Sequence, residues 1–328
     1  MFAKRSFLAA LAAFALGLGA VGATRAQDYP SRPITLVVPF AAGGPSDAVG
    51  RIMAEGMRGP LGQAIAVENV AGAGGSIGVG RVARAMPDGY TILVGLWGTH
   101  VVNPVIYTLP YDPATAFEPI TLVASNPHLI ALKKDFPADD LNGLLAWLKA
   151  NPGKASLGHA GAGSPPHVAA VFFQKLTGTS FQYVPYRGAG PAVQDLVAGH
   201  IDMVIEAPVP VVAQLHAGLI KVVAVVEKTR LAAAPEIPTV DEAGLPGFYL
   251  SNWFALYAPR GTPPAIVRRL DAAAVTALAD PTVRARFAEI GQEIFPAGQQ
   301  TPQALSALQK SDTEKWWPII RAAGIKAE

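Results

Sequence analysis

The amino-acid sequence predicts an α/β protein of two domains, each built on a mostly parallel sheet flanked by helices. Along the chain, short apolar runs rich in β-branched residues alternate with turns rich in glycine and proline and with amphipathic stretches of helical period. This alternation is typical of parallel, doubly wound sheets. The length of 328 residues fits two domains at roughly 150 residues each, and the 51% of hydrophobic residues can fill two cores.

The first strand and helix illustrate the repeating unit. The run ITLVVPF at 34–40 is followed by the turn AAGGPSD and by a helix expected over 46–57. Further strands are expected at 64–69, 91–96, 128–133, 155–158, 181–184, 203–206, 221–226 and 251–258. Further helices are expected at 77–85, 141–151, 166–177, 189–198, 208–217, 264–279, 281–290 and 302–320.

The composition excludes several kinds of chemistry. The absence of cysteine removes disulfides, thiolate metal sites, cysteine nucleophiles and lipid-modified cysteine anchors. Charged residues make up only 15% of the chain, which argues against a nucleic-acid-binding surface. The six histidines lack metal-ligand spacing, and Ile77 stands where a dinucleotide fingerprint needs its third glycine. We therefore expect no cofactor, no metal and no nucleic-acid partner.

The first residues have the features of an export signal. Lys4 and Arg5 precede an apolar stretch at 7–18, and small residues end at Ala26, after which we expect cleavage. The alternative is a membrane anchor, but a bilayer needs about 20 apolar residues and this stretch is shorter. Cleavage also removes Arg25 and leaves one fewer basic than acidic residue. We expect a soluble periplasmic protein without a stable membrane anchor.

Five turns that follow predicted strands form the walls of an expected ligand cleft. In doubly wound sheets, ligands collect beyond the carboxyl ends of the strands. Glycine permits close backbone approach, and the first turn of each following helix directs unpaired N–H groups and a positive dipole end outward. Such a site suits a small anion. The five turns span 40–47, 97–100, 158–167, 186–191 and 206–208.

Individual side chains in these turns have two interpretations each. Ser46 and Asp47 either cap the first helix or help to hold a carboxylate. His167 either fixes its loop or reaches the ligand, and Arg187 either binds an anion or bridges its loop to a neighbour. Glu206 would favour an amino group, a hydroxyl or water if it faces the cleft, and is otherwise a helix N-terminal acid.

Aromatic residues divide into two groups. Trp97, which lies beside Gly98-Thr99-His100 after a strand, is expected near the ligand. Trp316 and Trp317 on the last helix are expected to serve in packing.

A serine hydrolase is the alternative from another functional class. Gly74-Gly75-Ser76-Ile77-Gly78 matches the G-x-S-x-G nucleophile elbow. An elbow serine sits at the immediate end of a strand, whereas the strand here is expected to end near Asn69. The other interpretation is a glycine loop leading into a helix, with Ser76 near its N-cap. The hydrolase requires an exposed Ser76 with a histidine within reach.

Several ordered motifs resemble the Bug (TctC-type) extracytoplasmic solute receptors of tripartite tricarboxylate transporters. The resemblance extends over essentially the whole chain after the signal. The matching runs are YPSRPI at 29–34, VPFAAGGPSD at 38–47, EN at 68–69 with GAGGSIG at 72–78, PDGYT at 87–91, YDP at 111–113, NPGK at 151–154, VPYRG at 184–188, PTVDEAG at 238–244 and APRGTP at 258–263.

The resemblance implies a two-lobed, type II periplasmic-binding-protein fold. Its first lobe would comprise 27–125 and 250–328, and its second lobe 126–249. Such a receptor closes over a small organic carboxylate, acts without catalysis, and passes the ligand transiently to an inner-membrane permease, here as a monomer. A two-lobed receptor that docks on a membrane chemosensor is an alternative with the same site.

The resemblance also implies that two loops, 40–47 and 161–167, grip the carboxylate through backbone N–H groups, hydroxyls and water. An extra proline in Gly163-Ser164-Pro165-Pro166-His167 reshapes this wall, so the ligand of a relative does not transfer. The ligand-binding residues predicted from both arguments are Phe40, Ala41, Gly43, Pro45, Ser46, Asp47, Trp97, Thr99, His100, Gly161, Ala162, Gly163, Ser164, His167, Arg187 and Glu206.

Overall fold

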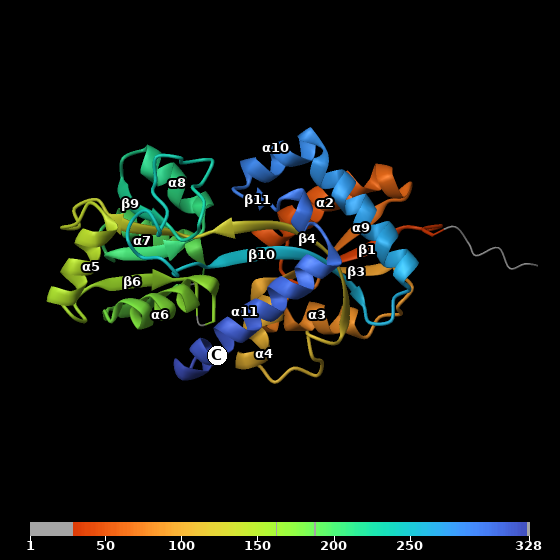
Figure 1. The fold of residues 1–328 in the computed structure, drawn as a ribbon, viewed down its shortest axis with the longest axis horizontal. Coiled ribbons are helices and arrows are strands. Elements are labelled where there is room, and N and C mark those ends of the chain that lie inside the picture. The colour runs from red at the N-terminus through yellow and green to blue at the C-terminus, as the bar shows by residue number, and fades with distance from the viewer. Residues whose placement is uncertain (1–28, 162, 187, 327–328) are drawn as a thin grey trace, which may run out of the picture. The chain divides into compact units, whose positions relative to one another are not determined.

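A computed structural model describes residues 29–161, 163–186 and 188–326 of the chain (Figure 1). By its contacts the chain divides into two units, Met1–Ser31 and Arg32–Glu328. The predicted signal peptide falls outside the described residues. All described strands and helices belong to the second unit, and the following account concerns that unit.

The second unit contains two sheets, which we call sheet 1 and sheet 2. Sheet 1 has six strands in the order β11-β4-β10-β3-β1-β2. They are β1 (Ile34–Val38), β2 (Ile65–Asn69), β3 (Thr91–Leu96), β4 (Phe117–Pro127), β10 (Ser251–Pro259) and β11 (Glu293–Ile294). Sheet 2 has five strands in the order β7-β6-β8-β5-β9. They are β5 (Leu129–Lys133), β6 (Ser156–His159), β7 (Gln182–Pro185), β8 (Met203–Glu206) and β9 (Ile220–Val225).

The α/β architecture is confirmed, but the expectation of mostly parallel pairing is wrong. In sheet 1, β10 pairs antiparallel with both β3 and β4, and β11 pairs antiparallel with β4. In sheet 2, β5 pairs antiparallel with both β8 and β9. The parallel pairs are those of β1 with β2 and β3 and of β6 with β7 and β8. The sheets are mixed because the strands that carry the chain between them insert among the parallel βα units.

Helices cover both faces of each sheet (Figure 1). In Figure 1, α2, α9 and α10 lie above sheet 1 and α3, α4 and α11 lie below it. The apolar side chains of α7 and α8 pack on one face of sheet 2, and those of α5 and α6 on the other. The helices are α2 (Pro45–Leu61), α3 (Ser76–Ala83), α4 (Asn103–Ile106), α5 (Leu141–Ala150), α6 (Pro165–Thr177), α7 (Ala189–Val197), α8 (Pro208–His216), α9 (Pro264–Ala279), α10 (Pro281–Glu289) and α11 (Pro302–Ala322). Short helical turns are η1 (Ala73–Gly75), η2 (Gly98–Val102) and η3 (Ala297–Gln299).

Local sequence explains where α2 begins and ends. Pro45 occupies its first turn, where the missing N–H is not needed. Gly62 follows its last residue with φ 70°, a left-handed conformation that suits glycine, and its N–H bonds the Arg58 and Gly59 carbonyls. Met53 and Met57, one turn apart, are fully buried and anchor the helix on the sheet.

The longest strand, β4, was not predicted. Its sequence, FEPITLVASNP, contains two prolines and a charged residue, which interrupt a strand pattern. It forms because β10 and β11 pair with it on both sides and because Ile120, Leu122 and Val123 are buried. Tertiary pairing therefore overrides local propensity here.

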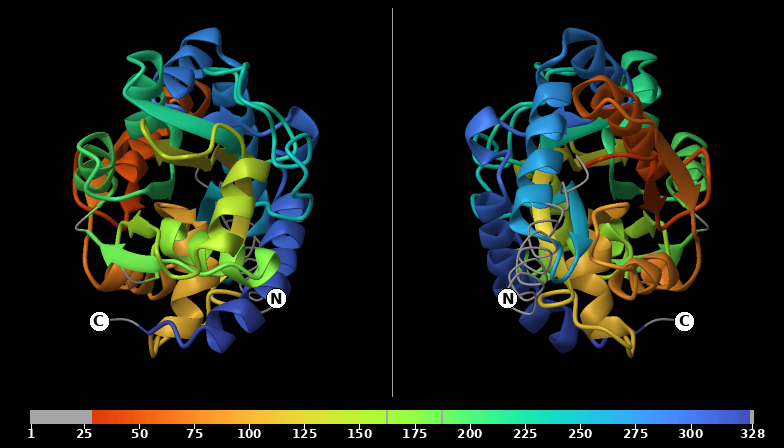
Figure 2. Two further views of the ribbon diagram at one scale, coloured as in Figure 1. Left: turned by 90° about the vertical axis from the view of Figure 1, so that its left-hand side faces the viewer. Right: turned by 90° about the vertical axis from the view of Figure 1, so that its right-hand side faces the viewer.

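Helix α11 contacts the elements of both sheets. Trp316 packs edge-on against Trp97, which follows β3, with ring centroids 5.4 Å apart, and against Phe172 of α6 at 5.1 Å. The indole N–H of Trp317 donates to the Val101 carbonyl at 2.9 Å. Figure 1 shows α11 running across β10 toward α6, and Figure 2 shows the two halves from either end. The expected packing role of both tryptophans is confirmed.

We expect Gly95→Ala to destabilise the protein by about 1–3 kcal/mol. A Cβ at Gly95 would lie 2.5 Å from His100 Cε1 and 2.6 Å from the Tyr257 ring, and both rings are buried. Gly98→Ala, three residues away, is the matched control, because its nearest heavy atom would be Leu96 Cδ1 at 3.8 Å. Urea unfolding of both variants measures the difference. Equal midpoints would contradict this packing.

Candidate functional site

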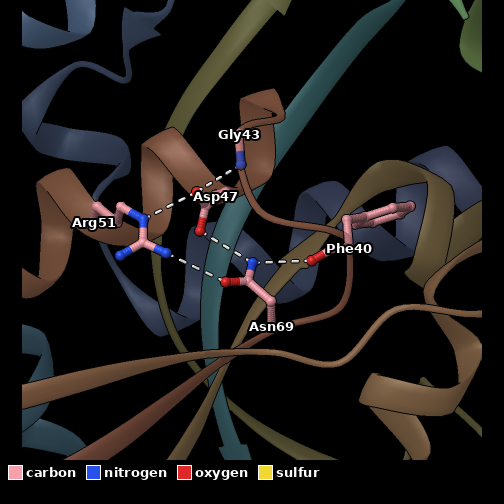
Figure 3. Close-up of polar contacts among 5 residues, drawn as sticks. All are labelled: Phe40, Gly43, Asp47, Arg51 and Asn69. Atoms are coloured by element: carbon pink, nitrogen blue, oxygen red, sulfur yellow. Dashed lines mark hydrogen bonds and ion pairs between the residues drawn. The ribbon is translucent and has the colours of Figure 1, made fainter.

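The loop between β1 and α2 is held by a hydrogen-bonded network around Asp47 (Figure 3). Asp47 Oδ2 accepts from the Gly43 N–H and from Arg51 Nε, both at 2.9 Å. Asp47 Oδ1 accepts from Asn69 Nδ2 at 3.0 Å, and the same nitrogen donates to the Phe40 carbonyl at 2.9 Å. The side-chain hydrogen bond from Arg51 is the main reason that the pKa of Asp47 is lowered to about 2. The network fixes the loop in one conformation.

Both carboxylate oxygens of Asp47 are therefore occupied by protein groups, and its side chain is 6% exposed. The expectation that Ser46 or Asp47 caps α2 is wrong, because the N-cap is Gly44 and no side chain caps the helix. Asp47 instead orders the loop that precedes the helix. Ala41, Gly43 and Pro45 are exposed, and Phe40 is partly buried.

The N-terminus of α2 keeps unpaired backbone donors. Its N-cap, Gly44, has no side chain, and its carbonyl accepts only from the Ala48 N–H at 3.0 Å. Among the described residues, the backbone N–H groups of Ser46 and Asp47 have no partner outside the helix. Ser46 itself is 7% exposed. Unpaired N–H groups and the positive end of a 17-residue helix dipole create an environment for an anion.

A second loop, 72–75, packs beside the first. Its four residues all have positive φ, and Gly75 at 91° precedes α3. A Cβ at Gly75 would lie 2.8 Å from Thr99 Cγ2 and 3.0 Å from the Phe40 ring, so only glycine lets these loops approach. Asn103 Nδ2 donates to the Gly74 carbonyl at 2.8 Å and fixes the loop.

Ser76 takes part in packing rather than presenting an exposed hydroxyl. It begins α3, is 9% exposed, and its Oγ accepts from Asn103 Nδ2 at 3.0 Å. No histidine among the described residues hydrogen-bonds to it. This arrangement favours the loop-to-helix interpretation of the glycine motif.

The loop 159–167 of sheet 2 uses its own donors internally. The Gly163 N–H donates to His167 Nδ1 at 3.1 Å, and the Ser164 N–H donates to the Gly161 carbonyl at 3.2 Å. The Ser164 hydroxyl donates to the same carbonyl at 2.7 Å and accepts from the His167 N–H at 3.4 Å.

The start of α6 therefore differs from the predicted backbone grip. Pro165 and Pro166 have no N–H, so the first turn of α6 offers no backbone donor beyond that of His167, which is used by the Ser164 cap. The sequence identified the double proline as a change in this wall of the expected cleft. The structure shows that the change is the loss of backbone donors. The remaining polar groups of this loop are side chains.

Two imidazoles are stacked in this loop. The His159 and His167 rings lie 4.4 Å apart at 19°, with the Tyr183 ring edge-on to both. His167 Nδ1 accepts from Gly163, so a neutral ring carries its proton on Nε2. Burial first, and the neighbouring His159 second, lower the pKa of His167 to about 4, so the ring is neutral at pH 7. His167 Nε2–H is thus a neutral donor.

Three predicted ligand contacts are core residues. Trp97 and Thr99 are fully buried and His100 is 1% exposed. The His100 ring stacks on Tyr257 at 4.2 Å, and burial lowers its pKa to about 3. Thr99 Oγ1 donates to the Leu96 carbonyl at 3.0 Å. The chain turns into η2 directly after β3, and this turn directs these side chains under β10 and α11 instead of outward.

Glu206 lies at the end of β8 and is 4% exposed. Its Oε1 accepts from the Ala207 N–H at 2.9 Å. Burial raises its pKa to about 7, and this hydrogen bond opposes the shift. The remaining predicted residues, Ala162 and Arg187, lie outside the described residues.

Sequence reasoning missed the residues that support the loops from elsewhere in the chain. Asn69 and Asn103 act through contacts with residues that are distant in sequence. His159 lies within the predicted turn 158–167, where it stacks on His167 of the same loop. The sequence did single out Asn69, because it belongs to the EN motif at the end of the second predicted strand. Nothing in the sequence around Asn103 indicated its role.

Two hollows lie beside these loops, the first lined by Arg51 of the Asp47 network and the second by Ala73 of loop 72–75. One of about 490 Å³ lies between α2, β2 and α10 and is lined by Arg51, Arg58 and Arg286 among others. The other, of about 260 Å³, lies beside α3 and is lined by Ile77 and Tyr107 among others. No predicted ligand-binding residue lines either hollow. Within the described ranges, no group of three or more histidine or acidic side chains is placed to hold a metal ion.

Comparisons with known proteins agree with this fold. The family described as "Tripartite tricarboxylate transporter family receptor" matches residues 49–325. A UPF0065 protein from the TAR-I ttuE-ttuC' intergenic region of Agrobacterium vitis is 40% identical over 92% of this chain and 87% of its own length.

Two solved structures show the same architecture. The periplasmic binding protein BugD is 38% identical, with a TM-score of 0.75 over 92% of this chain and 100% of BugD. MatC from Rhodopseudomonas palustris, solved with bound malate, is 37% identical, with a TM-score of 0.75 over 89% of this chain and 100% of MatC. The expected two-lobed periplasmic-binding-protein fold is confirmed.

We expect Asp47→Asn to destabilise the protein by about 2 kcal/mol at pH 7. Because the pKa of Asp47 is lowered to about 2 from 3.8, the stabilisation is present above pH 3.8 and is lost as the pH falls through 2. The difference between variant and wild type should therefore shrink between pH 4 and pH 2. Urea unfolding across this range measures it.

The control is Glu55→Gln, an exposed acid on the same helix with no hydrogen bond to another described residue. It should leave stability unchanged. A gap between Asp47→Asn and wild type that stays constant down to pH 2 would contradict the role of the Asp47 carboxylate.

Proposed function

Because the chain belongs to the receptors of the tripartite tricarboxylate transporter family, we propose that it captures a small organic carboxylate between its two lobes and delivers it to a membrane permease. A carboxylate is supported by MatC, a protein 37% identical that holds malate. It is also supported by the unpaired N–H groups and the positive dipole end at the α2 N-terminus. The receptor works without catalysis and without a cofactor.

We assign 27–125 and 250–328 to the first lobe and 126–249 to the second. This assignment is supported by sheet membership, because the chain leaves sheet 1 at the end of β4 and enters sheet 2 at β5. It returns between β9 and β10. These two crossings are the hinge about which the lobes close on the ligand, which shifts the protein from an open to a closed population.

The proposal rests mainly on the start of α2, where backbone N–H groups lack hydrogen-bond partners. Among the described residues, the N–H groups of Ser46 and Asp47 have no partner outside the helix, and the Asp47 network holds the preceding loop through the Gly43 N–H. A carboxylate placed there accepts hydrogen bonds from these groups and interacts with the helix dipole. Closure of the lobes excludes water and strengthens these bonds.

The second lobe contributes the His167 imidazole in place of backbone amides. Its Nε2–H is the donor left by the Gly163 bond, and Ser164 and Gly161 hold the loop that carries it. Gly163 lies against Ile106 of the first lobe, since a Cβ there would be 2.6 Å from Ile106 Cδ1. This loop therefore lies at the boundary between the lobes. Arg187 and Ala162 stay in the proposed site on sequence grounds.

We propose that the protein is exported, cleaved after Ala26, and acts in the periplasm as a monomer. Export is supported by the N-terminal sequence and by BugD, a periplasmic binding protein. In the part of the chain that the structure describes, no helix has the length and hydrophobicity to cross a membrane.

A thermal-shift panel of small carboxylates tests this function. A carboxylate at 100 times its dissociation constant should stabilise the protein that lacks residues 1–26 by about 2.7 kcal/mol. The panel includes succinate, malate, glutarate, adipate, citrate and aromatic carboxylates, each matched with the neutral amide of the same skeleton. A shift with acids but not amides is expected. If no acid shifts the unfolding temperature and the denatured protein releases no bound acid, the proposal is wrong.

A pair of substitutions at one residue tests the grip at α2. Ser46→Pro removes the backbone N–H, and Pro165-Pro166 at the start of α6 shows that two successive prolines fit a first helical turn in this chain. We expect at least tenfold weaker carboxylate binding, about 1.4 kcal/mol. Ser46→Ala keeps the N–H and should change the affinity less. Calorimetric titration measures both, and equal effects of the two variants would contradict a backbone grip.

A further inference from the structure

The hollow between α2, β2 and α10 gathers basic side chains at one edge of sheet 1, and we call it the basic hollow. Its volume is about 490 Å³, and its lining includes Arg51 and Arg58 of α2 and Arg286 of α10. Arg51 is paired with Asp47, whereas Arg58 and Arg286 form no salt bridge with a described residue. Glu55 is the only acid among the described residues of the lining. The basic hollow therefore offers two unpaired guanidinium groups to acidic groups from outside the chain.

A free strand edge adjoins the basic hollow. In the described part of the chain, β2 is the last strand of sheet 1 and pairs only with β1. The Ile34 N–H donates to the Ala64 carbonyl at 3.0 Å, so the peptide group of Ala64 points toward β1. Peptide groups alternate between the two sides of a strand, so those of Ile65 and Val67 point outward. No other described residue bonds them, and such an edge can accept a further strand.

The free edge and the arginines share one face of the sheet. Ile65 and Val67 line the basic hollow together with residues of α2. Glu68 points to the opposite face, where its Oε2 accepts from Arg81 Nη2 of α3 at 2.8 Å. Successive side chains of a strand alternate in this way. An extended segment laid along β2 would therefore place every second side chain over the basic hollow.

The position of β2 in sheet 1 places this edge away from the two crossings between the sheets. The chain crosses through β4 and β10 in sheet 1, and β3 and β1 separate β2 from β10. In sheet 2, the crossing strands β5 and β9 lie at one edge and β7 at the other. With the crossings as the hinge, the cleft opens on the side away from them, so β2 and β7 border its mouth. A permease that receives the ligand meets the receptor at this mouth.

We propose that the basic hollow and the free edge of β2 dock an extended acidic segment of the membrane permease. This inference rests on the proposed function, because delivery requires a permease. The segment adds a strand to β2 through the peptide groups of Ile65 and Val67. Its acidic side chains pair with Arg58 and Arg286, which steers the encounter and selects the partner. A small anion would use the guanidinium groups and leave the strand edge unpaired.

Photo-cross-linking in the cells that naturally produce the protein identifies the occupant. Ala64→p-benzoylphenylalanine places the reactive group at an exposed residue that precedes β2 and lines the basic hollow. We expect a cross-linked peptide that comes from an integral membrane protein and carries acidic residues at alternate positions. Ala114→p-benzoylphenylalanine is the matched control, because Ala114 is exposed and lies near the start of β4, which three strands separate from β2. The control should not yield this peptide.

Three results of the cross-linking would overturn the docking site. They are cross-linking of Ala64→p-benzoylphenylalanine to a second copy of the receptor, cross-linking to a peptide without acidic residues, and the absence of any cross-linked protein.

Charge reversal tests the arginines. Membrane vesicles from the same cells take up the carboxylate that binds most tightly in the panel, and purified receptor is added to them. Arg58→Glu combined with Arg286→Glu should slow uptake by about tenfold or more, because the acidic segment would then meet like charges. The carboxylate affinity of this double variant should stay within about twofold of wild type, since neither arginine belongs to the proposed carboxylate site. Glu55→Gln, which removes the acid from the lining, should not slow uptake.

The control for charge reversal is Lys149→Glu combined with Lys154→Glu. Both lysines are exposed, form no salt bridge with a described residue, and lie before β6 of sheet 2. This double variant should take part in uptake like wild type. Equal loss of uptake in the lysine and arginine variants would contradict the docking site.

The uptake assay separates the failure of the docking site from that of the proposed function. Uptake that is unchanged in the arginine variant overturns the docking site and leaves the receptor function standing. If wild type binds a carboxylate and supports no uptake, delivery to a permease fails, and the docking site fails with it.

Discussion

The antiparallel pairing of β4 with β10 is the constraint on which the rest of the structure depends. It extends from Phe117 opposite Pro259 to Pro127 opposite Ser251, across the middle of sheet 1. A single residue, His128, separates β4 from β5, by which the chain enters sheet 2, and β10 is the strand by which it returns. The pairing therefore ties the two sheets together and supplies Trp253 and Tyr257 as the surface on which α11 packs.

The two halves of the candidate site offer an anion different hydrogen-bond donors. In the first half, an ion-paired network around Asp47 holds a helix start whose N–H groups stay unpaired. In the second half, two prolines remove those donors, and the Ser164 cap uses the next one. The imidazole of His167 remains, neutral at pH 7, so the proposed site offers a carboxylate hydrogen bonds and a helix dipole more than charged side chains.

The sequence predicted the parts of the fold that local patterns control. The strand at 91–96 and the helix at 264–279 have the expected bounds, because apolar periodicity and flanking proline define them. The strand β4 was missed, because its prolines hide a strand that only its neighbours stabilise. The turn between the first strand and the first helix was expected from turn chemistry, and its role as a ligand wall stays a prediction. His100 was misplaced, because nothing in its neighbourhood indicates that Tyr257, far along the chain, stacks on it.

The central claim is that a carboxylate binds at the start of α2, and amide chemical shifts test it most directly. Titrating the 15N-labelled protein with the carboxylate that binds it should move the backbone N–H signals of Ser46 and Asp47 downfield in a saturable way, because both would become donors to the ligand. Signals of Arg58 and Arg286, which line the hollow between α2, β2 and α10, should stay in place. Saturable shifts at that hollow, with Ser46 and Asp47 unmoved, would contradict the account.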